Sequence, residues 1–236
     1  MSPRNRVGVL ISGRGSNMTA LIRAAAEADF PAEIVCVISD QPEAQGLAVA
    51  ASSGIPTFVA PRAGHPNKAA HEGEIQRILD EAGVEIICLA GFMRILSADF
   101  TNRWVGRLIN IHPSLLPLFP GLTTHARVIQ QGMRIHGCTV HFVTAEMDAG
   151  PIIAQAAVPV LPTDTEGELA VRVLNMEHKI YPLALSMVAS GKARMENNRT
   201  VYAHGLEIGW GANTSLMVPS SVEEIVNLED LARRTP

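Results

Sequence analysis

The first 90 residues alternate short apolar runs with helical stretches, and this alternation restricts the possible folds more than any other feature. Four runs rich in β-branched residues have the character of buried strands, and they span residues 6–12, 33–39, 55–59 and 84–90. Between them the pattern predicts helices over residues 18–28, 42–53 and 68–82. Strands that alternate with helices at this spacing predict a parallel sheet with covered faces.

After Gly91 the alternation becomes irregular. The pattern predicts a short helix at 98–104, a strand beginning at 108, a helix near 125–131, strands at 137–143 and 151–160, and a hairpin at 192–202 that turns at Asn197-Asn198. Apolar residues at helical spacing predict one long helix over 166–190, which Pro182 should kink or divide. From about His204 onward Gly, Ser and Asn dominate, so we expect residues 204–236 to form a tail or interface segment.

Composition argues against several classes of protein. A net charge of −4 gives no electrostatic reason to expect a nucleic-acid partner. No apolar run approaches the roughly 18–20 residues that span a bilayer. Cys36, Cys88 and Cys138 lie in separate apolar runs without zinc-ligand spacing, so we expect reduced core residues of a cytoplasmic protein. With 236 residues the chain can bury a large α/β domain, which we expect to cover residues 1–203.

The stretch from Leu108 to Pro117 is the strongest candidate for chemistry. It begins as an apolar strand and ends at Pro113, whose ring removes a backbone donor and favours an extended residue before it. Asn110 and His112 have the same parity along the strand, so both should emerge on one face at its carboxyl end, where open α/β sheets bind ligands. An amide that donates two hydrogen bonds and an imidazole suit a developing oxyanion. An Asn and a His that close a turn are the simpler alternative.

The strand-to-helix turn after the first strand reads Ser-Gly-Arg-Gly-Ser-Asn and is typical of an anion site. Gly13 and Gly15 let the backbone come close to a ligand. Ser16 and Asn17 open a helix whose free N–H groups favour a phosphate. The alternative is that this segment is only a tight turn followed by an ordinary helix cap and binds no ligand.

A dinucleotide-binding turn is a rival interpretation of the same segment. It fits poorly, because Met18 occupies the third glycine position of that fingerprint. Asp40, near the end of the second strand, keeps this alternative open. A nucleotide-binding domain without catalysis would have no use for an Asn and a His at the end of the central strand.

Asp148 lies in a turn directly before Ala149-Gly150-Pro151. If its loop faces His112, the carboxylate would favour the imidazolium form, which can donate a hydrogen bond or a proton. A role in forming the turn would also explain an Asp here. His141, between two apolar residues, is interpreted as a core histidine.

The residues after the fourth strand could form one wall of a ligand pocket. Gly91 permits a close backbone approach, and Met93, Ile95 and Leu96 offer an apolar surface suited to a flat heterocycle. Ordinary core packing is the alternative for these residues.

The loop after His112 also needs a sharp reversal if that side chain is to face the Asp148 turn. A cis X–Pro bond is a common device for such a reversal, and we expect it at Leu116-Pro117.

The chain resembles the phosphoribosylglycinamide formyltransferase family through six motifs in order: ISGRGSN, LAGFMRIL, INIHPSLLP, FPG, HFVT and MDAGP. The resemblance runs from about Val7 to Tyr202. It implies a Rossmann-like α/β fold with a mostly parallel sheet, helices on both faces and antiparallel strands added in the C-terminal half. It also implies a phosphate-binding half over about 1–90 and a folate-binding and catalytic half over about 91–203.

The reaction implied by the resemblance moves a formyl group from the co-substrate 10-formyltetrahydrofolate to the primary amine of 5'-phosphoribosylglycinamide in purine biosynthesis, without a metal. Asn110 and protonated His112 would stabilise the oxyanion, and Asp148 would support the imidazolium. Small molecules would be the partners, with no nucleic acid or membrane, and the protein would be a monomer or weak homodimer. A methionyl-tRNA formyltransferase is the enzyme alternative, but that family adds a basic C-terminal domain for which this chain is too short.

The family's binding residues map onto this sequence by motif match. The acceptor would contact Gly13, Gly15, Ser16, Asn17, Gly91, Met93 and, through its ribose hydroxyls, Glu177. The folate would contact Lys68, Leu89, Arg94, Ile95, Leu96, Val143, Thr144, Ala145, Glu146 and Met147. Three positions depart from the pattern: Leu118 replaces a basic residue, Thr123 a common His, and Lys68 an Arg. None of these departures touches Asn110, His112 or Asp148, which form the catalytic trio that the resemblance implies.

Overall fold

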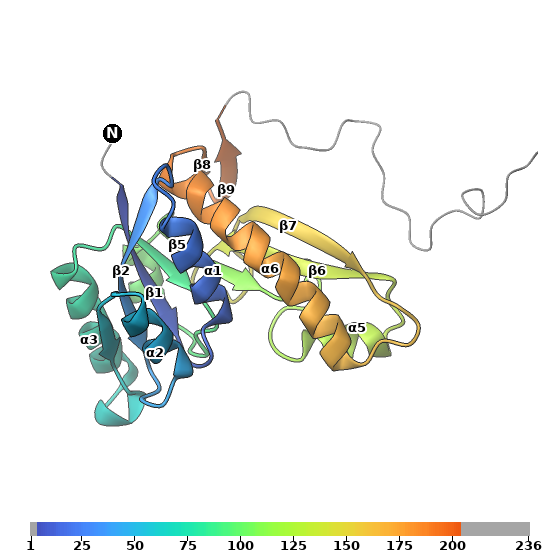
Figure 1. Cartoon of the computed structure of the whole chain (residues 1–236), viewed down its shortest axis with the longest axis horizontal. Helices are drawn as coiled ribbons and strands as arrows, with labels where there is room; N and C mark the ends of the chain where they lie inside the picture. The colour runs from blue at the N-terminus through green and yellow to red at the C-terminus, as the bar shows by residue number, and fades with distance from the viewer. Residues whose placement is uncertain (1–3, 204–236) are drawn as a thin grey trace, which may run out of the picture.

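The computed structural model describes residues 4–203 and shows a seven-stranded sheet flanked by helices (Figure 1). The expected tail over 204–236 lies outside the described residues. The strands of the sheet are β1 (Asn5–Ile11), β2 (Ala32–Ser39), β3 (Thr57–Val59), β4 (Ile86–Leu89), β5 (Leu108–His112), β6 (Ile135–Phe142) and β7 (Ile152–Pro159). The helices are α1 (Ser16–Ala25), α2 (Gln45–Ser52), α3 (Lys68–Glu81), α4 (Ala98–Arg103), α5 (Thr124–Gln130) and α6 (Glu166–Ala189), with a short 3-10 turn η1 (Arg62–Gly64).

The strand order is β3-β2-β1-β4-β5-β6-β7. The pairs from β3 to β5 are parallel, whereas β6 runs antiparallel to both β5 and β7. The predicted mostly parallel sheet with antiparallel strands in the C-terminal half is therefore confirmed. Strand β5 has a parallel neighbour on one side and an antiparallel neighbour on the other.

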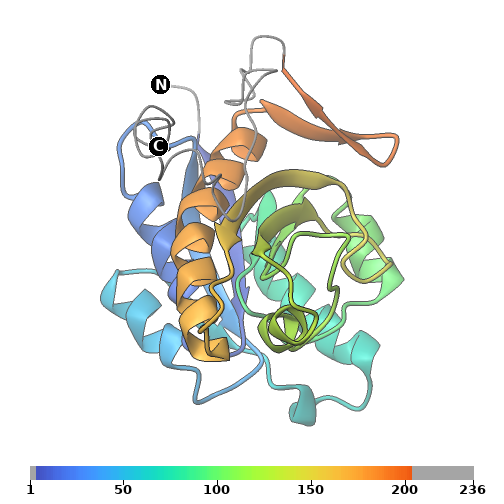
Figure 2. The same cartoon turned by 90° about the vertical axis from the view of Figure 1, so that its right-hand side faces the viewer.

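Helices cover both faces of the sheet, as Figures 1 and 2 show. One core joins the sheet to α1, α2 and α6 and includes Met18 and Leu185. The other core joins the sheet to α3 and α4 and includes Ile75 and Phe100. Because both faces are covered, the parallel strands are apolar along their length rather than alternating, and the last five residues of β1 are all buried.

The strand order reverses at β1, because the chain adds β2 on one side of it and later adds β4 on the other. In open α/β sheets the crevice at the carboxyl ends of the strands that flank such a reversal binds ligands. Ser12 follows β1 and donates its backbone N–H to the carbonyl oxygen of Gly91, which follows β4, across 3.1 Å. The two predicted binding turns, after β1 and after β4, therefore lie side by side.

Helix α6 runs from Glu166 to Ala189 without interruption, so the expected division at Pro182 is wrong. A capping box between Thr165 and Glu168 begins the helix. Proline removes one helical hydrogen bond. Buried residues on both sides of Pro182 pack the two halves of α6 into the same core, and this packing outweighs the lost bond.

The predicted hairpin near the end of the described chain is confirmed, with β8 (Ala193–Glu196) antiparallel to β9 (Arg199–Tyr202). Its turn residues Asn197 and Asn198 have φ values of 48° and 56°, which asparagine tolerates better than most residues.

The start of α2 is later than expected, at residue 45 rather than 42, because its N-cap Ala44 is still extended. Within residues 4–203, no helix is both long and apolar enough to cross a membrane.

Candidate active site

Strand β5 ends in two polar side chains that lie at the centre of the candidate site. Asn110 is half-buried, and His112 is 6% exposed. The antiparallel neighbour β6 places His141 directly opposite Asn110 and Thr139 directly opposite His112. Antiparallel pairing thus surrounds the end of the central strand with further polar groups, as opposed residues in such a ladder are close neighbours.

The turn that carries Asp148 faces His112. Oxygen Oδ2 of Asp148 lies 3.5 Å from Nδ1 of His112, and the carboxylate is 12% exposed. Asp148 has a φ of 55°, a left-handed conformation that Asp tolerates in turns. Gly150 lets the loop close on β6, because a Cβ at this position would lie 1.8 Å from the carbonyl oxygen of Phe142. The loop geometry therefore brings a carboxylate to the imidazole.

Both ring nitrogens of His112 face acceptors. Nδ1 faces Asp148, while Nε2 lies 3.0 Å from the carbonyl oxygen of Phe119. A carbonyl and a carboxylate can only accept, so the imidazole satisfies both as a donor only when each nitrogen carries a hydrogen. A neutral ring could donate to only one of these two acceptors.

The loop after β5 reverses sharply, and the predicted cis bond at Leu116-Pro117 is confirmed. The Thr139 hydroxyl fixes this reversal, because it donates to the carbonyl of Ser114 across 2.7 Å and accepts from the Leu116 N–H across 3.0 Å. Farther along the loop, the Gly121 N–H donates to Oδ2 of Asp148 across 2.8 Å. The reversal thus brings the loop back to the same carboxylate that faces His112.

His141 is buried, as expected of a core histidine, and it also borders the candidate site. It is 2% exposed, and burial lowers its pKa, with nearby His112 adding to the effect and the Phe142 carbonyl and Asp148 opposing it. A neutral His141 donates from Nδ1 to the Phe142 carbonyl at 2.9 Å. Its Nε2 is then an acceptor for Nδ2 of Asn110 at 3.2 Å. This bond orients the Asn110 amide and leaves its second N–H for a ligand oxygen.

Two further histidines, His125 and His136, pack beside Phe119 of the loop that follows β5. Nε2 of His136 and Nδ1 of His125 are 3.1 Å apart, and the ring of Phe119 meets His136 edge-on. His136 is 1% exposed, and burial, with the nearby His125 and His112, lowers its pKa to about 4. The pair therefore supports, as neutral groups, the segment whose carbonyl contacts His112.

The turn after β1 has the geometry of an anion site. Gly15 is the N-cap of α1 and has a φ of 74°, and no side chain among residues 4–203 caps this helix. Ser16 and Asn17 are thus the first residues of α1 rather than its caps. A Cβ added at Gly13 would meet no atom of the described part of the chain within 4 Å, whereas one at Gly15 would lie 3.0 Å from Gly46 Cα and from the Met18 side chain. Uncapped N–H groups beside an open glycine leave room for a phosphate.

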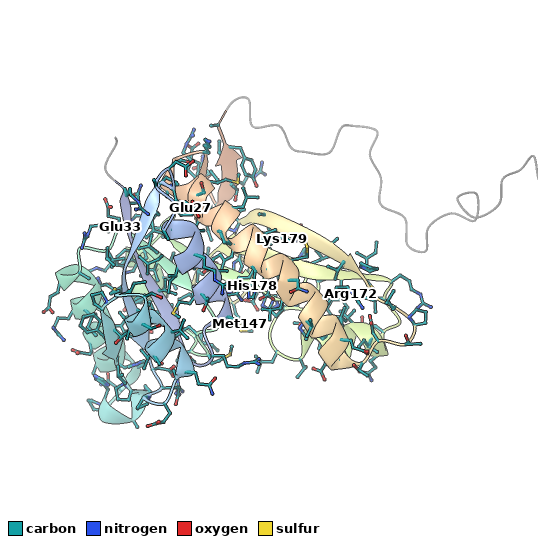
Figure 3. The ribbon with its side chains drawn as sticks, viewed as in Figure 1. Glu27, Glu33, Met147, Arg172, His178 and Lys179 are labelled. Carbon is teal, nitrogen blue, oxygen red and sulfur yellow. The ribbon has the colours of Figure 1, made fainter. Side chains whose placement is uncertain are left out.

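Glu177 and Asn17 meet across the site although they belong to different helices. Lys179, labelled in Figure 3, is on the exposed side of α6, whereas Glu177 is on the buried side and is 7% exposed. Burial raises the pKa of Glu177, and the hydrogen bond from Asn17 opposes that increase. One turn farther along α6, Tyr181 donates its hydroxyl to the Leu89 carbonyl across 2.8 Å, which fixes the helix over the end of β4.

The predicted folate wall is partly solvent-facing and partly core. Met93 and Ile95 are 67% and 69% exposed, and Met147, labelled in Figure 3, is 57% exposed. Leu89 and Leu96 are buried. Val143 and Thr144 are half-buried, whereas Ala145 and Glu146 are exposed with Met147. Exposed apolar side chains next to polar groups are what a flat ligand needs.

Other predicted residues stand apart from this arrangement. Lys68 is the exposed first residue of α3, and within residues 4–203 no hydrogen bond or ion pair joins it to the site. Leu118 is 52% exposed, and Thr123 is the N-cap of α5 with a φ of 54°. Asp40 does not present a free carboxylate to a ribose, because its side chain is fully buried and bonded to Ser12 and Arg94. The dinucleotide-binding interpretation therefore lacks the free carboxylate that it requires at this position.

The chain is similar to known proteins along most of its length. A family model described as formyl transferase matches residues 5–185. A phosphoribosylglycinamide formyltransferase from Escherichia coli is 43% identical over 190 residues, which cover 80% of this chain and 90% of that protein. A crystal structure of a phosphoribosylglycinamide formyltransferase from Brucella melitensis is 56% identical, with a TM-score of 0.77, and the match covers 85% of this chain and 100% of that one.

Longer proteins also contain a similar segment. The trifunctional purine biosynthetic protein adenosine-3 from Bos taurus is 50% identical over 193 residues, which cover 82% of this chain and 19% of that protein. The chain therefore spans a fifth or less of the length of these trifunctional relatives.

Proposed function

The chain belongs to the formyl transferase family, and we propose that it transfers a formyl group from 10-formyltetrahydrofolate to the primary amine of 5'-phosphoribosylglycinamide in purine biosynthesis. The observation that carries this proposal is the meeting of Asn110, His112 and Asp148 at the carboxyl end of β5. Strand β5 is the direct neighbour of β4, and the turn after β4 lies beside the turn after β1, where the strand order reverses. The names of the relatives, which share most of this chain, support the choice of acceptor.

The reaction begins with attack of the acceptor amine nitrogen on the formyl carbon. The C=O electron pair moves to oxygen, and a tetrahedral intermediate with an oxyanion forms. The free N–H of Asn110 can donate to this oxygen, since the other amide hydrogen faces His141. A fixed donor aimed at developing charge is among the largest single contributions that an enzyme makes.

His112 would supply a second donor. At 3.5 Å, the contact of Nδ1 with Asp148 is longer than an ordinary hydrogen bond, so a ligand oxygen can share that N–H. Asp148 would then offset the positive charge of the imidazolium. When the intermediate collapses, the bond between the formyl carbon and N10 breaks, N10 gains a proton, and the acceptor nitrogen loses one. His112 or a bound water can carry the proton between them.

The remaining residues would bind the two substrates. The uncapped start of α1 with Gly13 and Gly15 would hold the phosphate, and Glu177 would accept from ribose hydroxyls. The wall formed by residues 93–96 and 143–147 would hold the pterin. We further propose a cytoplasmic location, which the three buried, unpaired cysteines support. Its partners would be the small-molecule substrates, and it would act as a monomer or weak homodimer.

The direct test is an absorbance assay of donor deformylation in the presence of 5'-phosphoribosylglycinamide. We expect deformylation that depends on the acceptor, with the formyl group recovered on its amine. An acceptor with a blocked amine and initiator methionyl-tRNA serve as controls. Loss of formyl at the same rate without the acceptor, or transfer to the tRNA instead, would contradict the proposal.

A further inference from the structure

Asp40 is a buried carboxylate outside the catalytic trio, and it binds three donors. Its side chain is 0% exposed. It accepts hydrogen bonds from the Ser12 hydroxyl at 2.6 Å, from Nε of Arg94 at 2.6 Å and from Nε2 of Gln41 at 3.1 Å. Burial raises the pKa of this carboxyl, but the three hydrogen bonds together outweigh burial and hold the pKa below its usual value. Asp40 is therefore charged at neutral pH.

Ser12 extends this contact to the backbone of the loop after β4. A hydroxyl has one hydrogen, and that of Ser12 is donated to Asp40, so the oxygen is oriented to accept. The Met93 N–H donates to that oxygen across 2.8 Å. Two consecutive residues of the loop are thus attached to a single carboxylate, Met93 through Ser12 and Arg94 directly.

Buried side chains hold the two ends of this loop but not its middle, because Phe92 and Leu96 pack in the core with Ile75 and Phe100. Met93 and Ile95 are 67% and 69% exposed, and Arg94 is 42% exposed. Gly91, at the start of the loop, has a φ of 76° and contributes no side-chain packing. The hydrogen bonds to Asp40 and Ser12 are therefore the contacts that fix where residues 93–95 lie.

We propose that Asp40 is a positioning residue for the folate donor. It holds the wall of residues 93–96 against the end of β1, so that the pterin enters a preformed site and no binding energy is spent on ordering the loop. This inference rests on the proposed function. It assigns Asp40 no contact with substrate and no part in the chemical step. The donor KM should therefore depend on Asp40 more strongly than the acceptor KM, since Met93 is the one residue of this wall that is also an expected acceptor contact, and kcat should not change.

Asp40→Asn tests the proposal, because an amide keeps the volume but places a donor or a neutral oxygen opposite Arg94. Asp164→Asn is the matched control: Asp164 is also a nearly buried carboxylate, 3% exposed, paired with a partly exposed arginine, Arg172 on α6 (Figure 3). We expect Asp40→Asn to raise the donor KM about tenfold, the equivalent of about 1.4 kcal/mol. The acceptor KM and kcat at saturating donor should stay within about twofold of the wild type.

Several outcomes would overturn the inference. A donor KM unchanged by Asp40→Asn would do so, as would a parallel change of both KM values and kcat, or the same donor effect in Asp164→Asn. If Asp40→Asn does not fold, Ser12→Ala removes the Met93 contact but keeps the ion pair, and an unchanged donor KM in that variant is equally decisive. Calorimetry of 10-formyltetrahydrofolate binding without acceptor separates the two proposals. Wild-type protein that binds the donor but transfers nothing contradicts the proposed function, while the Kd ratio of variant to wild type still tests Asp40.

Discussion

Nδ2 of Asn17 donates to Oε2 of Glu177 across 2.6 Å, and this bond joins the first helix of the domain to the last long one. The other amide atom, Oδ1 of Asn17, is buried and has no hydrogen-bond partner within residues 4–203. A buried oxygen that accepts no hydrogen bond lowers the stability of the fold, and a hydrogen bond from a ligand hydroxyl would offset that loss. The proposed binding site for the acceptor substrate would thus be assembled from residues near opposite ends of the described chain.

Replacing His112 with alanine should abolish most turnover. Its donor bond to the oxyanion forms mainly in the transition state, and loss of one such donor costs on the order of 10²–10³ in kcat. Binding of the acceptor phosphate, which we assign to the turn after β1, should be nearly intact. Steady-state kinetics with calorimetry of acceptor binding would measure both, and near wild-type kcat in His112→Ala would refute the mechanism.

Asp148→Asn should displace the pH–rate profile as well as lower the rate. The amide removes the negative charge 3.5 Å from His112, so the limb that requires the protonated ring should move to lower pH. The amide can still accept from the Gly121 N–H, so the loop should keep its shape. A profile measured from pH 5 to 9 decides the matter, and an unchanged rate and profile would leave Asp148 only a turn residue.

Substitutions at Gly13 and Gly15 should separate ligand binding from folding. An alanine Cβ at Gly13 has open space in the protein, so Gly13→Ala should weaken acceptor binding without changing stability. Gly15→Val adds strain at a φ of 74° and a close contact with Gly46, so it should weaken acceptor binding and also lower the free energy of unfolding. Donor affinity should change little in both variants. Calorimetry with each ligand checks this, and equal weakening of donor and acceptor in Gly13→Ala would place the phosphate elsewhere.

His136 should make the fold less stable in acid. Its pKa of about 4 is below the ordinary 6.5, so the fold favours the neutral ring. The contribution of His136 to the free energy of unfolding is fully present above pH 6.5. It is lost as the pH falls toward 4, by roughly 3 kcal/mol in total, at 1.36 kcal/mol per pKa unit. His136→Gln should remove most of that dependence. Urea unfolding at several pH values would measure it, with His65→Gln as a control, and an equal acid dependence in His136→Gln and wild type would contradict the assignment.

Much of the fold follows from local patterns. The alternation over the first 90 residues predicts the parallel sheet, because both faces of those strands are buried and their sequences are continuously apolar. The parity of Asn110 and His112 and the double asparagine of the hairpin are also local features. Pro182 shows the limit of this reasoning, since packing of both halves of α6 outweighs the local effect of the ring.

The rest of the candidate site depends on contacts between distant segments. His141 is opposite Asn110 only because β6 is antiparallel with one particular register, which no local pattern around His141 specifies. Asp40 likewise has its role through Ser12 and Arg94, which are far from it in sequence. The resemblance to known formyltransferases supplied the pairing of His112 with Asp148, which spacing alone could not give.

The antiparallel partner of β5 has a consequence for tolerance to insertions. Side chains along β6 alternate between its two faces, so one residue added to β6 ahead of Thr139 would turn both Thr139 and His141 away from the site. Asn110 would lose the group that orients its amide, and the reversal after β5 would lose the hydroxyl that fixes it. The length of β6, more than the identity of most of its residues, therefore sets whether this chain can keep its chemistry as it diverges.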